Sequence, residues 1–187
     1  MRVIAASRVS GRQDASEREL KSALAQRLAH PPRRLDRLSL QALLAAAPLR
    51  GRVQADCGLY LAADYPARSN MFALLDSVCL QQRLPKPFEF VNSVSNAAGF
   101  HVAQQLGLDG PNLFIGAGQQ VWRHLLELAE LDLAGGRVSQ ALLLLCREDG
   151  GAFHAEALLL DSNGAAPEGG DFAGLSAGLA VEQLTLD

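Results

Sequence analysis

Cysteine, excess basic charge and long apolar runs are all scarce in this sequence, and each shortage narrows the class of protein. Only three cysteines occur in 187 residues. Cys57, Cys79 and Cys146 form no C-x-x-C pair, so free thiols in a reducing compartment fit better than a disulfide framework or a zinc site. No stretch approaches the roughly 18 apolar residues of a membrane-spanning helix, and no long apolar signal segment opens the chain. We therefore expect a soluble, cytoplasmic protein with no membrane partner.

An excess of basic residues is also missing. The chain has 17 lysines and arginines against 20 aspartates and glutamates, a formal net charge of -3. This balance argues against nucleic acid as the main partner, because phosphate neutralisation needs a basic face. Hydrophobic residues make up 49% and charged residues only 20%, which excludes a disordered chain. The length suits one core, so we expect a single domain over residues 1–187.

Apolar runs of strand length alternate with helical patterns along the chain. Strands are expected at Arg2–Ala6, Cys57–Asp64 and Asn112–Gly116, in "RVSQALLLLCRE", in "GAFHAEALLLDS" and in "GLAVEQLTL". Helices are expected in "ASERELKSALAQRLA", at Asp36–Ala47, Ser69–Arg83 and Ser95–Leu108, and from about Gln119 to Leu133. This order predicts an α/β fold with a mixed, mostly parallel sheet flanked by helices. The "DGG" between two of the strands predicts a hairpin, which we expect to supply an antiparallel edge.

Local signals support several of these elements. Ser16 and Glu19 form an S-x-x-E capping box ahead of apolar residues at helical spacing, and Ser69 or Asn70 is expected to cap the third helix. The stretch "LPKPFEFVNSV" reads as an extended loop that ends in a short strand, and the segment from Gly164 to Gly174 reads as a loop.

The stretch "GPNLFIGAGQQ" is the most informative motif. It predicts a buried strand, a tight Gly-Ala-Gly elbow and then a helix that opens with Gln119 and Gln120. Such elbows commonly present a nucleophile, but an amide offers only hydrogen-bond donors and an acceptor. The backbone N–H groups at the helix N-terminus still predict an anion- or oxyanion-binding corner. Alternatively, the two glutamines are ordinary first-turn helix residues.

Four segments together resemble the β-ketoacyl synthase family, which has the thiolase fold. They are "RRLDRLSLQALLAAA", "CGLYLAAD", "SNAAGFHVAQQLGLDGPNLFIGAGQQ" and "GGRVSQALLLLC". The resemblance places the family's nucleophilic cysteine at Gln119 and covers roughly the first half of a ketosynthase. It implies that the second half, with two catalytic histidines and a lysine, is missing. His30, His101, His124 and His154 match none of those positions.

The resemblance therefore implies a catalytically inactive, chain-length-factor-like member without independent activity. Its role would be to pair with an active ketosynthase in fatty acid, polyketide or aryl polyene biosynthesis. The alternative is a stand-alone malonyl-acyl-carrier-protein decarboxylase or an acyl-binding hydrolase that uses the backbone amides of the elbow. We expect no catalytic residue, metal or cofactor in either case.

The same resemblance suggests where ligands and partners bind. Ligand-binding residues are expected at Asn96, Gly118, Gln119 and Gln120. The interface is expected along Asn112, Leu113, Phe114 and Ile115, with Phe114 projecting toward a partner, although this strand also suits an ordinary core position. A half-fold is further expected to expose apolar surface, which predicts a homodimer or a heterodimer with a ketosynthase subunit, an acyl carrier protein, or both.

Overall fold

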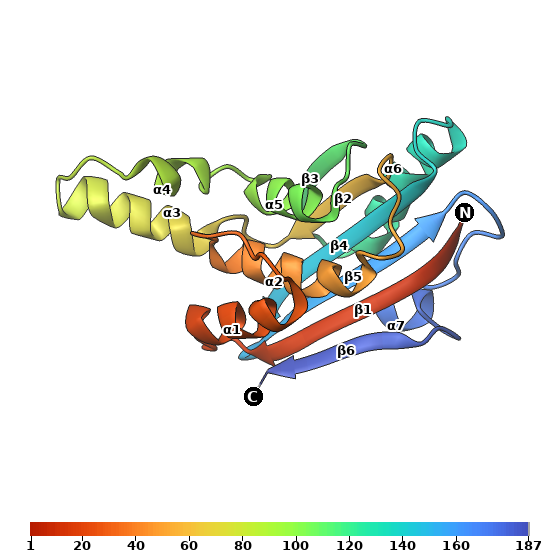
Figure 1. Ribbon diagram of the computed structural model, residues 1–187, viewed down its shortest axis with the longest axis horizontal. Coiled ribbons are helices and arrows are strands. Elements are labelled where there is room, and N and C mark those ends of the chain that lie inside the picture. Colours follow the sequence, from red (N-terminus) through yellow and green to blue (C-terminus); the bar gives the residue numbers. More distant parts are fainter. Residues whose placement is uncertain (187) are drawn as a thin grey trace.

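A single six-stranded sheet organises the chain in the computed structural model, which describes residues 1–186 (Figure 1). Asp187, the last residue of the predicted domain, lies outside the described residues. The strand order across the sheet is β3-β2-β4-β5-β1-β6. The strands are β1 (Arg2–Arg12), β2 (Gly58–Ala63), β3 (Asn112–Gly116), β4 (Gln140–Asp149), β5 (Ala152–Asp161) and β6 (Val181–Leu186).

Five strands run in one direction and β5 runs against them. The pairs β2·β3, β2·β4 and β1·β6 are parallel, whereas β5 is antiparallel to both β4 and β1. The mixed, mostly parallel sheet is thus confirmed, but the expected antiparallel edge is wrong. The hairpin turn does form at Gly150 and Gly151, whose φ values are 55° and 83°. β1 then covers the other edge of β5, so β5 lies inside the sheet.

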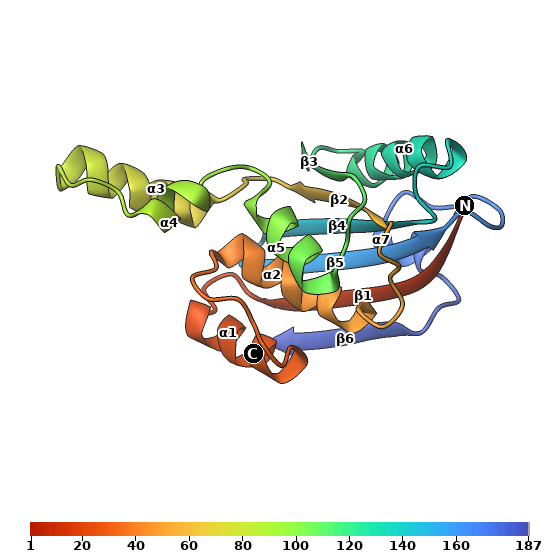
Figure 2. The ribbon, with the colours of Figure 1, turned by 45° about the horizontal axis from the view of Figure 1, so that its top comes forward.

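Helices α1 (Glu17–Arg27), α2 (Arg37–Ala46) and α5 (Ala97–Leu106) cover one face of the sheet (Figure 2). From Leu38 onward every residue of α2 is buried, because α1, α5 and the sheet all pack against this apolar helix. Asp36 caps its first turn by accepting a hydrogen bond from the Ser39 N–H at 3.0 Å. The predicted capping box of α1 is present in full, between Ser16 and Glu19.

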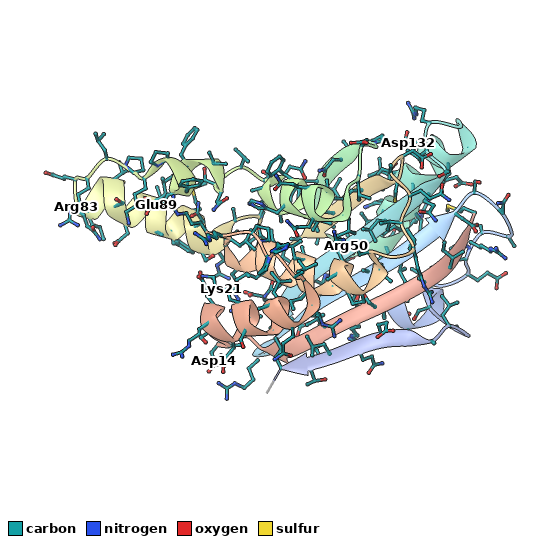
Figure 3. The ribbon with its side chains drawn as sticks, in the orientation of Figure 1. Asp14, Lys21, Arg50, Arg83, Glu89 and Asp132 are labelled. Atoms are coloured by element: carbon teal, nitrogen blue, oxygen red, sulfur yellow. The ribbon has the colours of Figure 1, made fainter. Side chains whose placement is uncertain are left out.

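The opposite face carries a smaller cover made by α6 (Val121–Ala134) and the short α7 (Phe172–Leu175). The helix α7 lies in a segment that was predicted to be a loop. Tyr60 of β2 donates a hydrogen bond to Asp132 of α6, and Arg137 forms an ion pair with the same carboxylate. Figure 3 labels Asp132 on α6. The Tyr60–Asp132 hydrogen bond holds α6 against β2.

The segment 65–94, here called the arm, projects away from the sheet (Figures 1 and 2). It consists of α3 (Arg68–Leu75), a π-helical turn (Asp76–Leu80) and α4 (Pro87–Val91), with Arg83 near its far end (Figure 3). The extended loop expected here is wrong, because Pro87 suits a first helical turn and the Glu89 carboxylate accepts from the Lys86 N–H at 2.8 Å.

The predicted cap of α3 is also wrong. The cap position falls on Ala67, whose φ is 51°, and no side chain caps the helix. Asn70 instead donates to the backbone oxygen of Glu89, which joins the two halves of the arm. No helix within residues 1–186 is long and apolar enough to cross a membrane.

The Ser16 cap yields a test of the α1 assignment. Ser16→Ala removes the acceptor for the Glu19 N–H, so the free energy of unfolding should fall by about 1 kcal/mol. Urea denaturation measures this change. Ser22→Ala, on the exposed side of the same helix, is the matched control and should leave stability nearly unchanged. Equal effects of the two substitutions would contradict the capping role.

A network of partly buried hydrogen bonds connects α2 to the end of β4. The Arg37 Nε donates to Glu148 at 2.8 Å, and its other nitrogens donate to the backbone oxygens of Ala15 and Gln13. Gln41 donates to the same carboxylate at 3.3 Å. Burial alone would raise the pKa of Glu148, but these hydrogen bonds and the Arg37 charge hold that pKa below its ordinary value.

The depressed pKa of Glu148 predicts a pH-dependent contribution to stability. Because the folded pKa lies below the unfolded one, the contribution is present above the unfolded pKa and is lost as the pH falls through the folded pKa. Glu148→Gln should therefore lower the free energy of unfolding by about 1–3 kcal/mol near neutral pH. The difference should shrink between about pH 6 and about pH 3. Denaturation at several pH values checks this, with Glu182→Gln on exposed β6 as control; a constant difference would contradict it.

Candidate functional site

The elbow predicted from the sequence is present at the carboxyl end of β3. Ala117 continues the strand by donating its N–H to the backbone oxygen of Ala63 at 2.9 Å. The oxygen of Gly118 then accepts hydrogen bonds from the Val121 N–H at 3.3 Å and from the Arg147 Nη2 at 2.8 Å. Arg147, near the end of β4, therefore holds the elbow through its backbone.

The backbone conformation of the elbow does not require glycine at positions 116 and 118. Neither Gly116 nor Gly118 has a positive φ, and a Cβ atom added at either position would meet nothing within 4 Å. The space above the elbow is therefore open. The predicted tight elbow is present, but it is an ordinary turn held by hydrogen bonds to its backbone.

Gln119 and Gln120 are both exposed at this open position. Gln120 precedes the first residue of α6 without capping it through its side chain, and its amide oxygen accepts from Arg123 at 3.4 Å. Gln119 lines a cavity between α6, the end of β4 and the first half of β5. Gly118, Gln119 and Gln120, three of the four predicted ligand-binding residues, thus lie together.

Asn96, the fourth predicted ligand-binding residue, lies at the other end of β3. Its side-chain nitrogen donates to the backbone oxygen of Asn112 at 3.2 Å, four residues before the elbow begins at Gly116, or roughly 13 Å along the strand. A Cβ atom on Gly99 would come within 2.3 Å of the Asn96 side chain, so the first turn of α5 packs closely here. The structure therefore does not bring Asn96 to the elbow; it places this residue where α5 meets β3.

The predicted interface strand β3 lies at the edge of the sheet. Within residues 1–186 it pairs with β2 alone. Leu113 is exposed, while the side chains of Phe114 and Ile115 pack partly against the two core clusters of their own chain. The central core strand is instead β4, where Leu142–Leu145 are buried. Phe114 thus directs its side chain into its own core, contrary to the expected projection.

Three polar residues near the elbow were missed by the sequence reasoning. Arg8, Arg147 and His154 lie on three different strands and line the same cavity as Gln119. Each lies on a strand that also carries other polar residues, so no local sequence pattern sets the three apart. His101 lies apart, with its Nε2 3.5 Å from the Asn92 side chain, and burial lowers its pKa. No group of metal-binding side chains is found among the described residues.

No family model matches the sequence, and no curated protein matches it significantly. Solved structures do match the fold. The structure titled the ishigamide ketosynthase/chain length factor is 19% identical with a TM-score of 0.62, covering 72% of this chain and 47% of that one. The ketosynthase ApeO in complex with its chain length factor ApeC, from Xenorhabdus doucetiae, is 19% identical with a TM-score of 0.64, covering 88% and 79%.

A third similar structure is AntDE:AntF, a type II polyketide synthase acyl-carrier protein in complex with its ketosynthase. It is 15% identical with a TM-score of 0.50, covering 64% of this chain and 42% of that one. The chain thus spans about half the length of the first structure and 79% of the second. At these identities the likeness concerns the fold. The resemblance to the β-ketoacyl synthase family is thereby confirmed at that level: the chain has the α/β fold of ketosynthase and chain-length-factor structures.

Proposed function

We propose that this chain is a non-catalytic, chain-length-factor-type partner of an active ketosynthase in fatty acid, polyketide or aryl polyene biosynthesis. The observation that carries the proposal is the free edge of β3, which runs directly into an elbow that presents Gln119. The comparisons support it, because two of the similar structures are named as ketosynthases with chain length factors.

The chemistry of the elbow supports a role without catalysis. Condensation needs a thiolate to hold the acyl group, an oxyanion hole and imidazoles. The Gln119 amide cannot form a thioester. Cys57 and Cys146 are buried in the sheet, where burial raises the pKa of Cys57 to about 12 and also raises that of Cys146. Cys79 lies out on the arm. No thiol in the described chain therefore takes the place of the family's nucleophile.

The backbone of β3 is suited to pairing with a partner strand. The oxygen of Pro111 and the N–H of Ala117 both bond to β2, so in this parallel pair the odd-numbered positions face β2. The N–H and C=O groups of Asn112, Phe114 and Gly116 consequently face the free edge. An edge with unpaired backbone groups is a template for strand addition. Phe114 thus contributes to the proposed interface through its backbone rather than its ring.

The arm supplies a second surface for a partner. Most of the exposed large apolar side chains of the described chain belong to it: Tyr65, Met71, Phe72, Leu75, Val78, Leu80, Leu84, Phe88, Phe90, Val91 and Val94. Together such side chains expose on the order of 1,000 Å², comparable with the ~800 Å² that each partner buries in a standard interface. Large exposed apolar surface of this kind marks sites of interaction with other proteins or membranes. The α6 helix, by contrast, exposes mainly polar residues, among them Arg123, Glu127 and Glu130.

Co-expression with candidate ketosynthases and size-exclusion chromatography test the proposal. Gly116→Pro removes an N–H from the free edge and leaves the β2 pairing intact, so it should weaken the complex at least tenfold. The arm variant Leu80→Ser/Leu84→Ser should do the same, because these side chains are 79% and 94% exposed. Leu131→Ser, on α6 and 64% exposed, is the matched control. Far-UV circular dichroism confirms that each variant folds.

Two outcomes would overturn the proposal. The first is that neither a ketosynthase nor an acyl carrier protein binds and product chain length is unchanged when the chain is removed. The second is turnover of malonyl- or acyl-carrier substrates by the purified chain that falls in Gln119→Ala. That result would instead favour the decarboxylase or hydrolase alternative, which no comparison supports.

A further inference from the structure

The cavity below the elbow has a composition that pairing with a ketosynthase does not explain. Its volume is about 510 Å³, and it opens on the face of the sheet covered by α6 and α7. Five elements besides the elbow meet in it: β1, β4, β5, α6 and α7. Its wall contains a set of polar and aromatic residues: Arg8, Gln119, Trp122, Arg147, His154 and Phe172.

Strand register brings the polar residues together. Arg147 of β4 lies opposite His154 of β5, and Arg8 of β1 lies opposite Glu156 of β5. His154 and Glu156 are two positions apart, so they project from the same face of the sheet. The Arg147 side chain also holds the Gly118 oxygen of the elbow. The cavity floor and the elbow are therefore one connected unit.

Three nitrogen atoms in this wall are buried without a hydrogen-bond partner: the Nε of Arg8, the Nε of Arg147 and the Nδ1 of His154. The Nε of Arg8 lies 3.3 Å from Glu156 and that of Arg147 lies 3.8 Å from Asp64, as ion pairs without hydrogen-bond alignment. An arginine Nε can only donate. A buried donor left without an acceptor is destabilising. The cavity therefore lacks an aligned hydrogen-bond acceptor for the two arginine Nε atoms.

The acidic groups around the cavity do not supply this acceptor. Asp171 uses its carboxylate to cap α7, accepting from the Gly174 N–H at 2.8 Å. Asp149 lies at the exposed end of β4. Burial raises the pKa of Glu156, although the neighbouring Arg8 and Arg147 charges oppose this. The cavity therefore places two guanidinium groups beside three carboxylates, yet the Nε donor of each arginine has no aligned hydrogen-bond acceptor.

We infer that this cavity binds an oxyanion, a carboxylate or phosphate group of a small molecule, between Arg8, Arg147 and His154 and beside Gln119. Guanidinium groups match the geometry of both anions and form charge-assisted hydrogen bonds with them. Trp122 and Phe172, whose ring centroids are 6.1 Å apart, form the apolar wall that would contact the rest of the ligand. The inference is independent of ketosynthase pairing, since no residue of β3 or the arm takes part.

Trp122 makes the site directly measurable, because it is the single tryptophan of the chain. The full chain would be titrated with phosphate and, separately, with acetate, at constant ionic strength balanced with chloride. Tryptophan fluorescence should change saturably, with calorimetry as a second readout. Arg8→Gln should weaken binding at least tenfold. Arg123→Gln is the matched control. Arg123 is exposed on α6, next to Trp122, and forms an ion pair with Glu127 outside the cavity.

The two anions distinguish the sources of the ligand group. Saturation by phosphate alone assigns a phosphate ligand, and saturation by acetate alone assigns a carboxylate. Arg8→Lys keeps the charge but removes the Nε donor, so it should also weaken binding, and it replaces Arg8→Gln if that variant fails to fold. The inference is overturned if neither anion saturates by either readout, or if Arg123→Gln weakens binding as much as the Arg8 variants. Such a failure would leave ketosynthase pairing unaffected.

Discussion

The antiparallel pairing of β5 with both β4 and β1 is the constraint on which the rest of the structure depends. It joins the first strand of the chain to the last third, and it completes the sheet against which α2 and α6 pack. Every residue of β5 from Ala155 to Leu160 is buried. Because the side chains of a strand alternate, this one strand contributes to both core clusters at once. The same register places Arg8, Arg147 and His154 in one cavity.

The proposed partner interface and the proposed anion site differ in the polarity of their side chains and lie on different parts of the molecule. Exposed apolar side chains collect on the arm, whereas the lining of the cavity by the elbow includes two arginines, a histidine, an amide and three carboxylates. The arm and β3 contribute no residue to the lining of the cavity. The proposed interface and the proposed anion site therefore use different residues.

Sequence reasoning succeeded where the signal is local. The Ser16 capping box, the Gly150-Gly151 turn and the Asn112–Gly116 strand were all predicted, because each depends on residues within a few positions. It failed at α4, where two prolines indicated an extended chain but Pro87 begins a helix. The position of β5 was also missed, because its second neighbour, β1, lies about 150 residues earlier. For the same reason the residues of the cavity, spread over three strands, could not be grouped from the sequence.

The open surroundings of Gly116 and Gly118 have a consequence for how such a protein can evolve. The turn takes its path from an arginine below it and from the neighbouring strand, not from the size of its own residues. A small side chain at Gly116 or Gly118 would therefore fit without a steric clash. A lineage that keeps Arg147 and β2 can exchange the residue at position 119 without refolding, so the architecture persists while the chemistry that it displays is replaced.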